Sequence, residues 1–252
     1  MKKFIFCICF VTSFLFLSAQ DIPEALKNDF SIEKANLATA VKNQGQTGTC
    51  WSFSTTSLLE SQLLKNNNSN INLSEMFTVR NIYLDKATNY VMRQGAAQFG
   101  EGGLGHNVIE AIAKYGSMPE EAYSGLLPTQ QEYNHSKLVN ELKIYLDSLL
   151  KHKPLMPHWQ KGVAQILDKY MGAAPDKFNF EGKEYTAKNF AVEVLKFNAS
   201  DYVNLTSFTH KPFYEPFIID IPDNFSNGSY YNIPMEELIK VTKAAINNGF
   251  TV

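Results

Sequence analysis

Charged residues are scarce in this sequence, and neither sign is in clear excess. They make up 19% of the 252 residues, with 23 Lys and Arg against 25 Asp and Glu. Without a basic stripe or an acidic tail, no nucleic acid partner is predicted. Clusters of His, Cys, Asp and Glu at metal-ligand spacing are also missing, and the glycines at 100–105 lack the strand-turn-helix context of a nucleotide-binding motif. The sequence therefore predicts no metal and no cofactor.

Long apolar runs are missing beyond the first twenty residues. Lys2 and Lys3 precede an apolar run from Phe4 to Leu17, and small residues follow at 18–19. This is the layout of a secretory signal peptide, and the run is too short to favour a spanning helix. We therefore predict a signal peptide over 1–20, export to the periplasm or the exterior, and no membrane contact after its removal.

Cysteine is rare, with three in the chain. Cys7 and Cys9 lie in the predicted leader, so Cys50 is expected to be the only thiol of the mature protein. Exported proteins normally use cysteines in disulfide pairs, and a solitary one has no partner within its chain. Two interpretations follow, a reactive thiol or a small buried apolar residue in a helical scaffold.

Apolar periodicity and turn residues predict a mostly helical chain whose last part is more extended. Ser74 is expected to cap the second helix, Gly116 to end the third, Thr186 to cap a later short helix and Asn232 to cap the last. Thr47 and Thr49 are candidate caps for the first helix. The first three predicted helices cover 50–64, a stretch that opens at 73–75, and 107–115. Two more lie within 137–171, and the last two cover 187–196 and 232 to about 247. Phe178 to Lys183 reads as a strand and a turn, 201–222 as extended, and 250–252 as the opening of a strand.

The chemistry of the chain centres on Cys50, at the expected start of the first helix. The N-terminus of a helix carries partial positive charge, which favours the thiolate form that acts as a nucleophile. Acyl transfer also needs donors for the oxyanion, and the backbone N–H of Cys50 and the side-chain amide of Gln44 are candidates. The alternative for Gln44 is an ordinary loop glutamine.

The segment Gln44-Gly45, four further residues and Cys50-Trp51-Ser52-Phe53 resembles the nucleophile segment of papain-like cysteine peptidases. Thr47 stands where the papain branch has a disulfide cysteine, which points to the bleomycin hydrolase or aminopeptidase C branch. Further segments are similar to the same branch: Gly102-Gly103, Lys114 to Pro119, Phe180 to Thr186, Ser207 to Tyr214 and Ile221 to Asn224.

This resemblance implies an α+β papain-like fold with a helical insertion. The implied parts are a nucleophile half over 21–129, a helical insertion over 130–200 and the beginning of a β-rich half over 201–252. It implies attack of Cys50 on a peptide carbonyl, an acyl-enzyme intermediate and aminopeptidase action. Gly102 and Gly103 would align the substrate, with Trp51 also at the substrate site. Homo-oligomers are also implied, because relatives often form hexamers.

The family also needs a histidine base and an asparagine that orients it. None of the five histidines precedes an apolar strand, and no Asn-Ser-Trp-Gly is present; the histidines are His106, His135, His152, His158 and His210. His106 would at most line the cleft. We therefore expect the sequence to be truncated, with both residues beyond Val252. The alternative function is a catalytically inactive papain-like fragment or a peptide-binding module.

Overall fold

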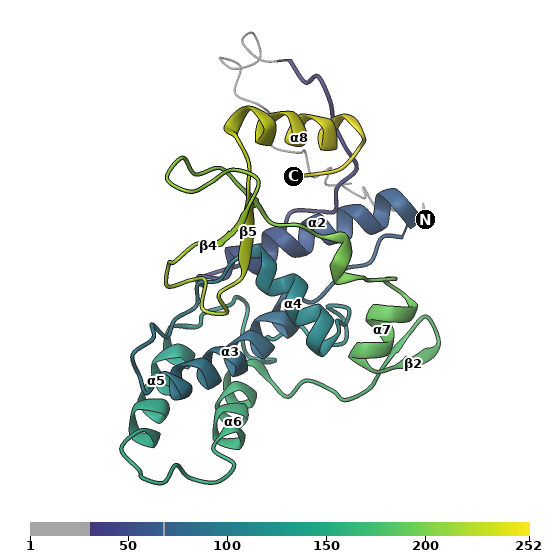
Figure 1. Cartoon of the computed structure of the whole chain (residues 1–252). Coiled ribbons are helices and arrows are strands. Elements are labelled where there is room, and N and C mark those ends of the chain that lie inside the picture. Colours follow the sequence, from purple (N-terminus) through teal and green to yellow (C-terminus); the bar gives the residue numbers. More distant parts are fainter. Residues whose placement is uncertain (1–30, 68) are drawn as a thin grey trace, which may run out of the picture. The chain divides into compact units, whose positions relative to one another are not determined.

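The computed structural model describes residues 31–67 and 69–252, shown in Figure 1. The chain divides into two compact units, 1–35 and 36–252. The first has no regular structure in its described residues, 31–35. The predicted signal peptide, with Cys7 and Cys9, lies outside the described residues.

Three helices build the core around the nucleophile segment. They are α2 (Cys50–Asn67), α3 (Glu75–Met92) and α4 (Gly105–Tyr115), and all three pack on one another. Small side chains allow close approach, and a Cβ on Gly105 would lie 3.0 Å from the Thr55 hydroxyl oxygen. Ser74 caps α3 as predicted, because its Oγ accepts from the Phe77 N–H at 2.9 Å.

The two amphipathic patterns form α5 (Ser136–Leu149) and α6 (Gln160–Met171), which pack on each other and on α3 (Figure 1). Their inward leucines at 138, 142, 146, 149 and 167 are fully buried. The apolar stripes therefore face one common core with the α3 helix, and 36–252 is one compact unit. The subdivision at 129 and 200 stays a prediction.

The strands are short. The predicted strand is β1 (Phe178–Phe180), and it forms a hairpin with a second strand that was not predicted, β2 (Lys183–Tyr185). The short helix α7 (Ala187–Glu193) follows with Thr186 as its cap. Phe190 of α7 packs edge-to-face on three aromatic rings of this hairpin, those of Phe178, Phe180 and Tyr185. A 3-10 turn, η1 (Ala199–Asp201), leads into a three-stranded sheet of order β3-β5-β4. Its strands are β3 (Leu205–Thr206), β4 (Pro216–Ile218) and β5 (Ser229–Asn232).

Several predicted boundaries were wrong. The third helix begins at Gly105, α7 ends at Glu193, and most of 201–222 is irregular instead of extended. The last helix, α8 (Met235–Asn247), is preceded by Pro234 at the cap position, whereas Asn232 is the end of β5. The Asn232 amide instead donates to the carbonyls of Phe208, Lys211 and Pro212.

The end of the chain also differs from the predicted strand. Residues 250–252 have no regular structure, and the Phe250 N–H donates back to the Ala245 carbonyl at 3.0 Å, which closes the end of α8. The Phe250 ring lies under the Lys65 ammonium, 3.7 Å from the ring centroid. The hydrogen bond at the end of α8 and the cation–π contact with Lys65 therefore hold Phe250 in a conformation that is not a strand.

Candidate active site

Cys50 is the first residue of α2 and its side chain is exposed. The preceding Thr49 is fully buried, and its carbonyl accepts from the N–H groups of Ser52 at 2.9 Å and Phe53 at 3.3 Å. The hydroxyls of Thr47 and Thr49 lie 2.6 Å apart, and Thr47 donates to the Gln44 carbonyl. Thr49 therefore stands at the cap position directly before α2, as predicted, but its hydroxyl and that of Thr47 bond within the loop and not to helix N–H groups. The thiol stands in solvent at the positive end of the helix.

Two neighbouring segments hold the loop that precedes Cys50. On one side, the Gln46 N–H donates to the Tyr133 carbonyl at 2.8 Å, and a Cβ on Gly45 would lie 2.6 Å from that carbonyl oxygen. Gly45 also has a φ of +60°, which favours glycine. On the other side, the Gly48 N–H donates to the Glu101 carboxylate at 2.6 Å. The loop that precedes Cys50 is thus held in place from both sides.

The Gln44 side chain bends back into its own loop. Its Nε2 donates to the Thr47 carbonyl at 2.6 Å. An amide nitrogen carries two N–H donors, so one remains beyond this bond. Its role as an oxyanion donor stays a prediction.

The glycine turn at 100–103 packs directly on the start of α2. The Trp51 ring lies beneath Gly103, where an added Cβ would stand 2.8 Å from a ring carbon, and its Nε1–H donates to the Glu101 carbonyl at 3.0 Å. Trp51 is buried. Its evident task is to hold the turn, and direct contact of Trp51 with substrate stays a prediction. Trp51, the residue after Cys50, thereby holds the glycine turn against the start of α2.

Lys86 of α3 holds the same turn through hydrogen bonds to its backbone. Its ammonium donates to the carbonyls of Gly100, at 2.8 Å, and Gly102. Burial lowers the pKa of Lys86 to about 8, against the opposing charges of Asp223 and Glu101. Lys86 and Glu101 were absent from the sequence-based site. A lysine within a predicted helix, ahead of a glycine turn, was the available signal, but only the fold brings Lys86 and Glu101 to the same turn.

The histidines lie elsewhere. His106 is 3% exposed, between the Tyr230 hydroxyl at 3.0 Å from Nδ1 and the Ser226 hydroxyl at 3.1 Å from Nε2, so it does not line an open cleft. His135 is buried beside the Tyr83 hydroxyl, and burial lowers its pKa to about 4. The three others are exposed: His152, His158 and His210. Among the described residues, no histidine is hydrogen-bonded to Cys50.

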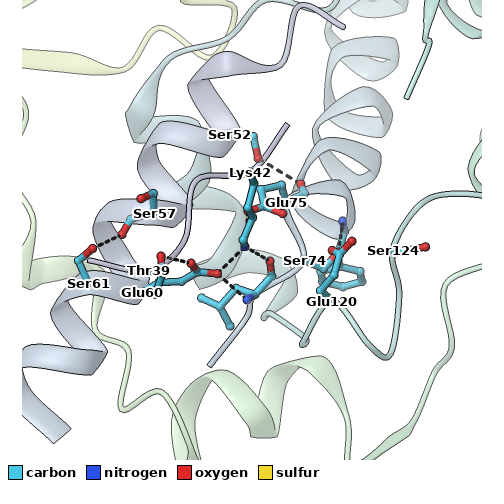
Figure 2. Close-up of polar contacts among 12 residues, drawn as sticks. Thr39, Lys42, Ser52, Ser57, Glu60, Ser61, Ser74, Glu75, Glu120 and Ser124 are labelled. Carbon is cyan, nitrogen blue, oxygen red and sulfur yellow. Dashed lines mark hydrogen bonds and ion pairs between the residues drawn. The ribbon is translucent and has the colours of Figure 1, made fainter. Parts of the chain in front are cut away.

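A buried charge cluster lies behind the nucleophile helix (Figure 2). The Lys42 ammonium contacts the fully buried Glu60 at 2.7 Å and Glu75 at 2.6 Å. Burial lowers the pKa of Lys42, but its bonds to both glutamates outweigh this and leave it raised. Burial also raises the pKa of Glu75 against the pull of Lys42. Because Glu60 also accepts from the Leu73 N–H at 2.7 Å, the cluster ties α2 to the start of α3.

Within the described part of the chain, no group of three or more His, Cys, Asp or Glu residues has the arrangement of a metal site. The described helices include none that is both long and apolar enough for a membrane span.

Comparison with known proteins finds a family match for one segment of this chain. Residues 26–147 match the model of the papain family cysteine protease. This segment belongs to the papain family. Viral cathepsin of Autographa californica nuclear polyhedrosis virus is 37% identical over 94 residues, which cover 37% of this chain and 25% of that protein.

Aminopeptidase C is similar over more of the chain. The protein of Listeria innocua is 25% identical over 258 residues, which cover 84% of this chain and 57% of that protein. Its counterpart in Listeria monocytogenes is 24% identical over the same shares. The chain thus spans a little over half the length of these relatives, and its homology to aminopeptidase C agrees with the predicted branch.

The fold itself matches a solved structure. PepW of Lactobacillus rhamnosis HN001 superposes with a TM-score of 0.71 at 17% identity, covering 87% of this chain and 59% of that one. The papain-like α+β fold predicted for this chain is therefore confirmed.

Proposed function

We propose that this papain-family chain belongs to a cysteine-type peptidase of the bleomycin hydrolase type that acts as an aminopeptidase on peptide substrates. The Cys50 thiolate attacks the peptide carbonyl, and its own N–H and the Gln44 amide hold the oxyanion. The C–N bond then breaks, the amine leaves with a proton, and water hydrolyses the thioester to the acid and the free thiol. Gly102 and Gly103 lie along the substrate backbone. The single observation that supports this most is the exposed thiol on the first residue of α2, next to a glycine turn packed on Trp51.

The reactivity of Cys50 tests the proposal. The mature protein, with Cys50 as its only thiol, is alkylated with iodoacetamide at pH 6, and the adduct is followed by mass spectrometry beside a cysteine-containing control peptide. We expect Cys50 to react at least tenfold faster than the peptide thiol, because an activated site holds more thiolate. A Cys50→Ser variant establishes that the adduct is at this residue. Equal rates would refute an activated nucleophile.

A peptide-binding module without catalysis is the second candidate. The observation that favours it is that no histidine among the described residues is hydrogen-bonded to Cys50. Aminoacyl and endopeptidase substrates with a fluorogenic leaving group separate the two when assayed with the full-length protein. Turnover that is lost in Cys50→Ser supports the enzyme, whereas binding without turnover supports the module.

We further propose export through the predicted signal peptide over 1–20, and homo-oligomer formation by analogy with relatives. The first rests on the two lysines, the apolar run and the small residues that follow it. Cell fractionation with detection of a C-terminal tag tests export, and sedimentation of the purified protein tests oligomer formation.

A further inference from the structure

The chain enters the nucleophile loop through an irregular segment, residues 36–43, which ends directly before Gln44. Among the described residues, none of the backbone N–H or carbonyl groups of 36–43 is hydrogen-bonded to another backbone group. Apolar burial does not hold the segment either, because Leu37 is 61% exposed and Val41 is fully exposed. Its polar side chains are therefore what fixes its position.

Thr39 and Lys42 both contact one buried acid of α2. The Thr39 hydroxyl donates to Oε2 of Glu60 and the Lys42 ammonium to Oε1, each at 2.7 Å (Figure 2). Glu60 is fully buried, and its Oε1 also accepts from the Leu73 N–H at 2.7 Å. Two side chains of the segment are thus bound to a carboxylate that the surrounding structure already holds in place.

Glu60 belongs to the helix that carries the nucleophile. Cys50 is the first residue of α2, and Glu60 lies about 15 Å further along the same helix at 1.5 Å per residue. Because Thr39 and Lys42 are bound to Glu60, the segment takes its position from the element that also positions the thiol. A satisfied buried polar network of this kind makes its surroundings rigid.

Only Asn43 separates Lys42 from Gln44, so a shift of the backbone at Lys42 is passed on to the candidate oxyanion donor. The Gln44 side chain already donates to the Thr47 carbonyl, and one N–H of its amide remains. Such a donor stabilises an oxyanion only at hydrogen-bond distance, and a misplacement of about 1 Å can lower a rate about a hundredfold. The placement of the Gln44 amide therefore depends on what holds Lys42.

We propose that Lys42 is a positioning residue, which through Glu60 holds Gln44 in place as the oxyanion donor for the reaction at Cys50. The assignment rests on the proposed function, since it takes Gln44 as a donor to the oxyanion. The three N–H groups of the Lys42 ammonium are taken by Glu60, Glu75 and the Leu73 carbonyl. Lys42 therefore acts through the backbone that leads to Gln44, and its loss leaves the thiol itself unchanged.

A peptide aldehyde tests the oxyanion donors without turnover. The Cys50 sulfur adds to the aldehyde carbon, the C=O double bond becomes a single bond, and the oxygen takes up the thiol proton. This oxygen then occupies the position of the oxyanion, and such analogues bind more tightly than ground-state ligands. The matching peptide alcohol cannot add to the thiol and serves as the ground-state ligand.

Dissociation constants of both ligands are measured for the full-length protein, Lys42→Met, Gln44→Ala and the double variant. We expect Lys42→Met to weaken aldehyde binding about tenfold or more, as the loss of an oxyanion donor implies, and alcohol binding less than about twofold. In the Gln44→Ala background the same substitution should have no further effect, because a residue that acts through Gln44 is not additive with it.

Two further variants cover a failure of Lys42→Met to fold, since unpaired buried acids are strongly destabilising. Thr39→Val removes one bond to Glu60 and should give the same pattern with a smaller change. Lys42→Arg keeps the charge and should retain most of the aldehyde affinity. Circular dichroism checks folding, and iodoacetamide should alkylate Cys50 at the parent rate in every variant.

Lys169→Met is the matched control, because Lys169 is an exposed lysine of α6 that pairs with Glu141 of α5. It should leave aldehyde binding unchanged. Equal weakening by Lys42→Met with and without Gln44, or no weakening in folded Lys42→Met or Thr39→Val, overturns the assignment.

The outcomes also separate this assignment from the proposed function. The expected aldehyde pattern without turnover of aminoacyl or endopeptidase substrates refutes only the catalytic function. Turnover together with an additive cycle refutes only the role of Lys42. A parent protein that does not bind the aldehyde overturns both.

Discussion

At the scale of single residues, Gly103 is a position where the protein tolerates little change. Its α carbon faces the Trp51 ring, and an added Cβ would lie 2.8, 2.9 and 3.1 Å from three ring atoms. The ring is buried and also donates to the Glu101 carbonyl. The ring cannot withdraw without breaking that bond, so packing alone requires that Gly103 has no side chain.

We expect Gly103→Ala to lower the free energy of unfolding by about 1–3 kcal/mol, the usual cost of overpacking. Gly100→Ala is the control, since a Cβ there meets nothing within 4 Å. It should change stability by no more than about 0.5 kcal/mol. Urea unfolding of both variants provides the measurement, and equal stability of the two would contradict the packing argument.

At the scale of elements, the N-terminus of a helix sets the positions of the residues around the site. The α3 helix begins at a buried cap, where the Ser74 hydroxyl accepts from the Phe77 N–H and donates to the Tyr123 carbonyl at 2.5 Å. That start also positions Glu75, which contacts Lys42, and one α3 residue further along, Lys86, supports the glycine turn. The cap of α7 is by comparison partly exposed, with a longer Thr186 bond of 3.3 Å.

Ser74→Ala should therefore destabilise the protein by about 2 kcal/mol, because it removes a cap and leaves the Tyr123 carbonyl unpaired. Thr186→Ala should cost about 0.5 kcal/mol, at the lower end for an N-cap. Thermal and urea unfolding compare the two variants directly. A larger loss for Thr186→Ala would mean that the buried second bond of Ser74 carries no weight.

At the scale of the whole molecule, His135 and Glu120 make the free energy of unfolding depend on pH in opposite directions. Burial lowers the pKa of His135 to about 4, so its contribution is lost as the pH falls from about 6.5 towards 4. Burial and the charge of Glu75 raise the pKa of Glu120 to about 7. The folded state therefore holds the Glu120 proton more tightly than the unfolded chain, and stability falls as the pH rises from about 4.5 to about 7.

Glu120→Gln should raise the Tm at pH 8 by about 2–4 °C, the shift that accompanies about 1 kcal/mol in a protein of this size. The carboxylate oxygen Oε2 of Glu120 is buried without a hydrogen bond, whereas a neutral amide avoids the repulsion from Glu75. At pH 5 the difference should vanish, because Glu120 is already protonated. The exposed neighbour gives the control, Glu121→Gln, which should show no such pH dependence. A Tm for Glu120→Gln equal to wild type at pH 8 would refute the assignment.

The sequence by itself determined the local part of this protein. Helix-capping residues, apolar periodicity and the Gln44–Phe53 segment predicted most helices, the β1 strand with the turn after it, the α+β class and the family. These features depend on residues close together in the chain, where spacing reports geometry directly. Local patterns were insufficient at Asn232, whose amide bonds three carbonyls from a distant segment, and at residues 250–252.

Only the tertiary structure decided which distant residues surround the glycine turn. Lys86, Trp51 and Asp223 come from a helix, the nucleophile segment and a late loop, and they meet at 100–103 because α2, α3 and α4 pack together. The contact of Asp223 with Gly102 depends on a loop closed by Asn224 and held by His106. Such a contact has no local signature, because its position is set by packing across more than a hundred residues.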